Sequence, residues 1–257
     1  MLDDFIFPVE KRPIIHNKKE SGHSKIVNLN DNSLVSVVSD DYVLIRNSIL
    51  IEKMTHELGD LLEVDKDGEL VKTNMFSNKR YFSMSFNLKT PPIEIAEKDP
   101  ISANIRIENS YDATSSLRVS MNATRLVCKN GLIADVGVYE KKQRHIGNIT
   151  EEDVVNEMIE SLNTSEKSFQ NVIERYKKMT SILVDDDIKS RFVSSISEAP
   201  NYVQKSIASE IANTVPTNLW ELYNCITFVT THKMDRKKLS TLKTEAFLNK
   251  SMMSIVE

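Results

Sequence analysis

Apolar and polar side chains alternate strictly between residues 80 and 89. In an extended chain, one face of this stretch would carry Phe82, Met84, Phe86 and Leu88. The opposite face would carry Tyr81, Ser83, Ser85 and Asn87. Further strand-like runs lie at 62–64, 70–71, 104–108, 117–122 and 136–139. A period of two predicts strands with one buried face, so we expect an antiparallel sheet whose other face is open to water.

After residue 150 the apolar period lengthens to 3.6. The stripe consists of Val154, Met158, Ile159, Leu162, Phe169, Val172, Ile173, Tyr176, Met179 and Leu183. It predicts one helix of about 30 residues, roughly 45 Å long at 1.5 Å per residue. Thr150 and Asp153 have the spacing of a capping box at its start, and Asp185–Asp187 ends it. Three shorter helices are expected at 188–196, 202–212 and 216–229.

Strands precede helices along most of the chain, which is the order of an α+β fold. We expect an antiparallel β-sheet in the N-terminal and middle part, then a long helix and a C-terminal helical bundle. A helix over 48–58, ended by Gly59, interrupts the first part. The expected regions are an extended N-terminal arm at 1–34, a mixed domain with the sheet at 35–149, a helical region packed on the sheet at 150–231 and a basic tail at 232–257.

The arm contains Pro8 and Pro13, which favour extended chain. It would dock on its own body or on a neighbouring subunit, and both alternatives stay open. The tail carries a cluster of basic residues followed by a weakly amphipathic stretch. Arm and tail together are expected to join subunits into a homo-oligomer.

The composition is that of a globular protein, with 257 residues, 40% hydrophobic and 27% charged. The net charge of −4 gives no global attraction to a polyanion, so any nucleic-acid site must be a local basic patch. Two cysteines do not form a disulfide framework, and a reducing bacterial cytoplasm is expected. The N-terminus lacks the pattern of a secretory signal. No apolar run reaches 18 residues, so no membrane span is expected.

Residues 109–117 concentrate small polar side chains, an aromatic ring and one acid between two predicted strands. Tyr111 could stack a base, and nearby hydroxyls such as that of Ser115 could hold phosphate oxygens. Alternatively, Asp112 hydrogen-bonds the backbone of a turn and Tyr111 packs in the core. Basic residues beside this stretch could line a positive groove on the wet sheet face, or form a solvated hairpin end. The expected nucleic-acid-binding residues are Tyr111, Asp112, Ser115, Arg118, Arg125, Lys129, Asn130, Lys141, Lys142, Arg144 and His145.

Signals for catalysis are weak. Cys128 and His145 could form a nucleophile–base pair, but no third member accompanies them, and free cysteine commonly behaves as a small buried hydrophobe. Histidines and acids show no metal-ligand spacing, and Asp185–Asp187 is interpreted as a helix break. Six glycines in the whole chain include no phosphate-binding glycine motif. No cofactor, no metal and no enzymatic activity are expected.

Three segments together resemble a known family. They are Asn109-Ser110-Tyr111-Asp112, Arg125-Leu126-Val127-Cys128-Lys129-Asn130 and Arg144-His145. In this order and spacing they are similar to the phage/plasmid-like domain-of-unknown-function family that includes the prophage proteins YfjQ and YafZ, over residues 35–230. That family usually has Gly at the position of Ala113, and alanine disfavours a positive φ, so a slightly different turn is expected. The resemblance implies a mobile-element origin and, by analogy only, a remote likeness to single-strand annealing proteins.

These patterns support two functional expectations. The first is a phage or plasmid accessory protein that binds single-stranded nucleic acid, with an annealing-type role in recombination or replication. The alternative is a protein–protein module of a mobile element, such as a virion component or an inhibitor of a host defence factor. Its partner would then be a host or phage protein. Neither expectation involves a membrane.

Overall fold

The computed structural model describes residues 6–65, 72–77, 79–125, 139–163, 166–234 and 239–256. The chain divides into two compact units, each built from separate stretches of sequence. The first unit comprises residues 1–89, 104–121 and 139–166. The second comprises 90–103, 122–138 and 167–257. Strands dominate the first unit and helices the second, which confirms an α+β fold.

The larger sheet of the first unit is antiparallel and has the spatial order β4-β5-β7-β8-β9. Its strands are β4 (Lys72–Ser77), β5 (Tyr81–Asn87), β7 (Asp99–Ser110), β8 (Leu117–Arg125) and β9 (Tyr139–Gln143). The β5–β7 register pairs Met84 with Ile107 and Phe86 with Ile105. These four apolar side chains therefore share one face, as the alternation predicts.

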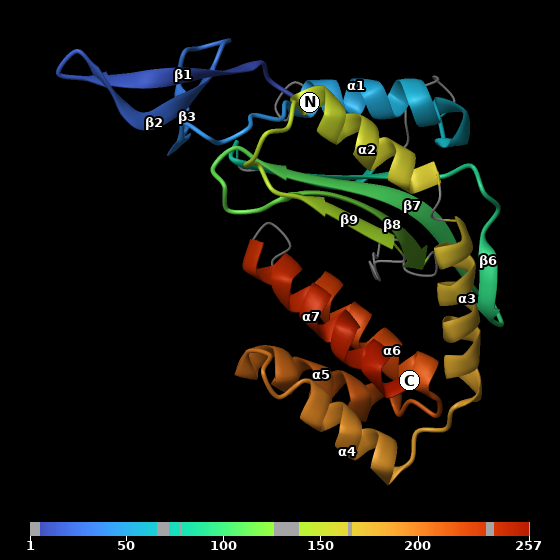
Figure 1. Cartoon of the computed structure of the whole chain (residues 1–257). Coiled ribbons are helices and arrows are strands. Elements are labelled where there is room, and N and C mark those ends of the chain that lie inside the picture. The colour runs from blue at the N-terminus through green and yellow to red at the C-terminus, as the bar shows by residue number, and fades with distance from the viewer. Residues whose placement is uncertain are drawn as a thin grey trace. The chain divides into compact units, whose positions relative to one another are not determined.

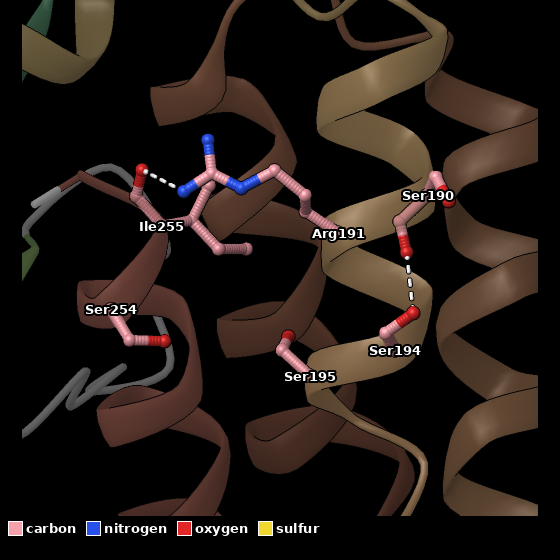
Figure 2. A pocket seen from close by; sticks show the side chains of 6 residues that line it. All are labelled: Ser190, Arg191, Ser194, Ser195, Ser254 and Ile255. Atoms are coloured by element: carbon pink, nitrogen blue, oxygen red, sulfur yellow. Dashed lines mark hydrogen bonds between the residues drawn. The ribbon is translucent and has the colours of Figure 1, made fainter.

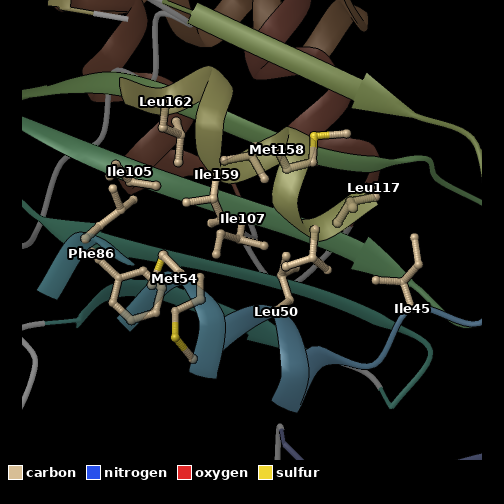
Figure 3. Packing of buried hydrophobic residues seen from close by; sticks show 14 of the residues in the cluster. Ile45, Leu50, Met54, Phe86, Ile105, Ile107, Leu117, Met158, Ile159 and Leu162 are labelled. Carbon is tan, nitrogen blue, oxygen red and sulfur yellow. The ribbon is translucent and has the colours of Figure 1, made fainter. Parts of the chain in front are cut away.

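Two helices cover that apolar face, α1 (Asn47–Leu58) and α2 (Glu151–Asn163). Figures 1 and 3 show both helices lying over the strands. Leu50 and Met54 of α1 and Met158 of α2 are completely buried in this core. The capping box at the start of α2 is confirmed, because the Asp153 N–H donates to the Thr150 hydroxyl at 3.1 Å.

Residues expected to form an extended arm build a second, three-stranded antiparallel sheet. Its strands are β1 (Val9–His16), β2 (Lys19–Asn28) and β3 (Leu34–Ser39), in that spatial order. The sheet has its own apolar core within the first unit: Phe7, Val9, Ile26, Val35, Val38, Tyr42 and Tyr111. The arm is thus packed on its own unit.

The β1–β2 hairpin, here called the ribbon (Val9–Asn28), extends past its neighbour. Strand β3 pairs only with His23–Val27 of β2. Residues 14–22 therefore form a two-stranded outer part that has no third strand beside it, as Figure 1 shows. Ser21–His23 on β2 lie opposite the single residue Ile14, so the ribbon carries a bulge where the outer part begins.

The second unit is mainly helical. Its elements are β6 (Ile93–Ala96), α3 (Glu166–Ser181), α4 (Asp186–Ser195), α5 (Asn201–Thr214), α6 (Leu219–Phe228), the π-helical turn η2 (Val229–Lys233) and α7 (Leu239–Val256). Tyr176, Trp220 and Tyr223 form its buried aromatic cluster, with ring centroids 5.0–5.9 Å apart. The Trp220 indole N–H donates to the Asp99 carboxylate at 2.8 Å. Asp185 and Asn218 cap α4 and α6, which explains where these helices begin.

The structure bears on two expectations about helices. The stretch predicted as one long helix from residue 150 contains α2 and α3, and α3 beyond Glu166 belongs to the second compact unit. Residues 164–165 between them lie outside the described residues. The apolar stripe continues through both helices, but a 3.6-residue period does not reveal which core each turn faces. The expected basic tail contains α7, whose Leu248 and Met252 are fully buried in the structure.

Candidate functional site

The polar turn after β7 is bound to the start of α1. The Asn109 side-chain amide donates to the Ile45 carbonyl at 2.7 Å and to the Asn47 side chain at 2.8 Å. The Asn47 backbone N–H, at the start of α1, donates to the Tyr111 hydroxyl at 3.0 Å. These bonds satisfy groups at a helix N-terminus that would otherwise be buried without partners.

The same turn also holds the three-stranded sheet. The Tyr42 hydroxyl donates to the Ser110 carbonyl at 2.5 Å, and the Ser36 hydroxyl of β3 donates to the Tyr111 carbonyl. The Tyr111 ring is 2% exposed and belongs to the core of that sheet. The expectation of an exposed stacking platform is therefore corrected: the ring packs inside the first unit, and burial raises the pKa of its hydroxyl.

Within the turn, the remaining polar groups hydrogen-bond one another. The Asp112 carboxylate accepts from the Thr114 N–H at 3.1 Å and from its hydroxyl at 2.6 Å. The Ser110 hydroxyl accepts from the Ser115 N–H at 3.1 Å and donates to the Ser115 carbonyl at 2.7 Å. Ala113 has φ +60°, so it adopts the conformation that glycine would adopt more easily. Of the two interpretations of this segment, the hydrogen-bonded turn is the one that its geometry fits.

His145 packs on Tyr42, the residue that donates to the Ser110 carbonyl of this turn. Its ring is 4% exposed and lies parallel to the Tyr42 ring, with centroids 4.8 Å apart. Nδ1 lies 3.1 Å from the Val43 carbonyl and so carries the hydrogen, while Nε2 is buried and has no hydrogen-bond partner among the described residues. Burial lowers the pKa of this imidazole. Cys128, the candidate nucleophile of the sequence analysis, lies outside the described residues.

The polar face of the larger sheet is buried, which corrects the expectation of a wet face. Ser83 and Ser85 are 1% and 0% exposed, and Arg106 and Glu108 are 7% and 6% exposed. The Arg106 Nε–H donates to the Ser83 hydroxyl at 3.0 Å, and the Tyr81 hydroxyl donates to Glu108 at 2.8 Å. Alternation correctly assigned these residues to one face, but the local pattern contains no information about what lies against it.

Carboxylates pair with three of the six lysines and arginines nominated from the sequence. Arg118 lies 3.0 Å from Glu108 and 3.2 Å from Glu140. Lys142 also pairs with Glu140. Lys141 points to the opposite face of β9 and lies 2.5 Å from Glu157 of α2. Among the described residues, Arg118, Lys141 and Lys142 therefore belong to an ionic cluster with carboxylates.

The remaining nominated residues contribute little to the expected positive groove in the described structure. Arg144 is exposed, and no carboxylate among the described residues lies within ion-pair distance of it. Arg125 ends β8, but its side chain lies outside what the structure describes. Lys129 and Asn130 also lie outside the described residues. The role of these residues in binding nucleic acid stays a prediction.

The ribbon is a cationic surface that sequence reasoning missed. Between residues 9 and 28 lie five lysines or arginines and two glutamates, whereas the whole chain has 33 basic against 37 acidic residues. Arg12 pairs across the strands with Lys25, and His16 with Lys19, so each pair shares a face. Arg12 has an ion pair with Glu10 at 2.7 Å.

Three lysines of the ribbon have no such partner. Lys18, Lys19 and Lys25 are exposed, and no described carboxylate lies within ion-pair distance of them. Asn17 and Lys18 form the turn with φ +50° and +60°, the combination of a type I′ hairpin. This local excess of charge and the Asn17 turn were the available signals. They were overlooked because the prolines favoured an unpaired arm.

A pocket of about 450 Å³ lies in the second unit between α4 and α7 (Figure 2). Its lining consists of Ser190, Arg191, Ser194, Ser195, Ser254 and Ile255. The Arg191 guanidinium already donates to the Ile255 carbonyl at 3.2 Å. The hydroxyls of Ser194 and Ser254 donate to carbonyls of their own helices. This open pocket offers few unused donors to a ligand.

No group of three or more His, Cys, Asp or Glu side chains in the described part could hold a metal ion. Among the described helices, none has both the length and the apolar character needed to cross a membrane.

The fold and the site together describe the class of protein: an α+β protein with a helix-covered antiparallel sheet and a buried polar junction. The family model for the domain of unknown function DUF932 matches residues 34–253. The chain therefore belongs to this family, and the whole ribbon lies ahead of the matched region. No curated protein and no solved structure matches the chain.

Proposed function

We propose that this chain is a non-catalytic nucleic-acid-binding protein whose ribbon contacts the phosphate backbone. The observation that supports this most is the exposed charge of the ribbon, where Lys18, Lys19 and Lys25 have no described carboxylate partner. Unpaired lysines on a projecting element can displace the counterions around a polyphosphate, which is the main source of sequence-independent affinity.

The ribbon also has the right shape. Two-stranded ribbons and sheets of DNA-binding proteins enter the major or the minor groove of the duplex. The acidic balance of the whole chain would keep other surfaces away from phosphates, so contact would concentrate on this element. The single-strand preference expected from the sequence depended on Tyr111, and the buried ring gives it no support.

Fluorescence anisotropy with labelled single-stranded DNA, duplex DNA and RNA tests the proposal. We expect Lys18→Ala/Lys19→Ala to weaken binding about tenfold and to reduce the salt slope by about two, one unit for each lost phosphate contact. The matched control is Lys205→Ala/Lys250→Ala, which removes two exposed lysines from α5 and α7. A second comparison is Arg118→Ala/Lys142→Ala in the ionic cluster, which should leave affinity within about twofold.

Two outcomes would contradict the proposal. If the wild-type protein binds none of the three nucleic acids at low salt, the protein is not a nucleic-acid-binding protein. If the Arg118/Lys142 variant loses affinity and the Lys18/Lys19 variant does not, the sheet face is the contact surface and the ribbon is not.

The other expectations stay predictions. Kinship with YfjQ and YafZ and a mobile-element origin rest on the sequence resemblance. A bacterial cytoplasmic location rests on the two cysteines, and a homo-oligomer rests on the expected arm and tail. A pull-down from nuclease-treated host lysate distinguishes the protein–protein alternative from nucleic-acid binding. A partner bridged by nucleic acid is lost on nuclease treatment, whereas a partner that survives it supports the protein–protein alternative.

A further inference from the structure

The tip of the ribbon combines charge with an exposed apolar side chain. Ile15 is 59% exposed and lies across the strands from Glu20, two residues from the turn at Asn17. Lys18 and Lys19 follow directly. A protruding aliphatic side chain with lysines beside it is the arrangement by which minor-groove architectural proteins wedge between base pairs while cations hold the phosphates.

The outer part of the ribbon has the freedom for such insertion. Residues 14–22 lie beyond β3, and isolated two-stranded hairpins are only marginally stable in water. Gly22 in the bulge has φ +77°, a conformation that glycine adopts without strain. The outer strands span about 13 Å at 3.3 Å per residue, which exceeds the groove depth of about 7.5–8.5 Å.

Composition favours a duplex over a single strand as the ligand. Proteins that bind single strands stack bases on aromatic side chains, and residues 9–28 contain no Phe, Tyr or Trp. Wedge residues of duplex-bending proteins are apolar side chains such as Ile, Leu, Met, Phe and Pro, and Ile15 is one of these. We propose that the ribbon binds duplex DNA and that Ile15 inserts between base pairs and bends the duplex. This inference rests on the proposed function.

Energy transfer between dyes at the two ends of a duplex of about 20 base pairs tests it, because such a duplex is far shorter than the persistence length of about 150 base pairs. Binding of the wild-type protein should raise transfer, as expected for a bend of about 20–90°. Ile15→Ala should abolish most of that rise while the dissociation constant changes by no more than about threefold, since the lysines supply the affinity. Leu34→Ala is the matched control, because Leu34 is an equally exposed aliphatic residue of β3, at 61%.

The outcomes separate this inference from the proposed function. Binding with a rise in transfer that Ile15→Ala leaves intact would overturn the wedge while nucleic-acid binding stands. Binding of single strands alone would overturn the duplex as the ligand and leave the proposed function in place. An absence of all binding would remove both. Circular dichroism of each variant checks that the fold is retained.

Discussion

At the residue scale, the segment with the most polar side chains proves to be a junction. Asn109, Ser110 and Tyr111 connect the larger sheet to α1 and to the three-stranded sheet through buried hydrogen bonds. A buried polar group without a partner costs about 1–3 kcal/mol, so such a set of groups is retained only as a complete network. The density of polar side chains in the sequence thus indicated a segment that matters for the structure, but it suggested the wrong role for Tyr111.

Replacing Ala113 with glycine should stabilise the protein. Ala113 has φ +60°, and a residue with a Cβ atom pays about 1–2 kcal/mol in that region. The greater freedom of glycine in the unfolded chain offsets part of the gain, so we expect Ala113→Gly to raise the free energy of unfolding by about 0.5–1 kcal/mol. Urea denaturation measures this, and a destabilised variant would show that the alanine methyl group makes compensating contacts.

His145 should make stability depend on pH. Its folded-state pKa is lowered by burial, whereas the unfolded chain has the ordinary value of about 6.5. Above that value both states are neutral and the residue has no effect. As pH falls through 6.5 the unfolded state takes up the proton first, so the free energy of unfolding decreases until the folded-state pKa is reached.

The measurement is urea denaturation at pH values from 8 to 5, for the wild-type protein and for His145→Gln. We expect the loss of stability towards low pH to be smaller in the variant. The other histidines in the first unit, at positions 16, 23 and 56, are exposed, so they serve as an internal background. Identical pH profiles would show that protonation of His145 does not lower the free energy of unfolding.

At the element scale, the larger sheet differs from a simple two-faced sheet because charge is buried on its polar side. Glu108 has a hydroxyl and two guanidinium groups as partners, with side-chain exposure of only 8%. Such clusters seldom add net stability, but removal of one member leaves uncompensated charge. The sheet therefore holds Arg106 and Arg118 in ion pairs, whereas Lys18, Lys19 and Lys25 of the ribbon have no described carboxylate within ion-pair distance.

Glu108 and Glu140 provide a matched pair for testing this. Glu108→Ala should lower the free energy of unfolding by about 3–5 kcal/mol, because the buried Arg106 and the half-buried Arg118 lose their shared carboxylate. Glu140 is 33% exposed, and Glu140→Ala should cost less than about 1 kcal/mol. Guanidinium denaturation measures both. Equal effects would mean that the buried side of the cluster is accessible to water.

At the scale of the whole molecule, the two compact units interleave in sequence. The chain passes between them several times: β7 runs from the second unit into the first, and β8 runs from the first into the second. The family match begins at residue 34, so the shared domain includes β3 but not the two strands of the ribbon. The proposed nucleic-acid contact is therefore an addition at the edge of the shared domain.

Interleaving predicts that the helical stretch does not fold alone. In a fragment of residues 167–257, Trp220 loses the Asp99 carboxylate that accepts its indole N–H. A buried donor left unsatisfied costs about 1–3 kcal/mol, a large part of a typical domain's stability. Trp220 is the only tryptophan, so its fluorescence reports directly on this unit. We expect red-shifted emission from the fragment, and a blue-shifted, cooperatively melting fragment would contradict this.

The sequence by itself determined the periodic features: which residues of β5, β7 and β8 share a face, where α1, α4, α5 and α6 lie, and the α+β class. Backbone geometry repeats every 2 or 3.6 residues, so these features can be recognised in short windows. Only the tertiary structure decided that the polar face is buried, that Arg118 pairs with Glu108, that Tyr111 packs inside, and that residues 9–28 pair as a ribbon. Each of these depends on a partner in another element, and no local period specifies that partner.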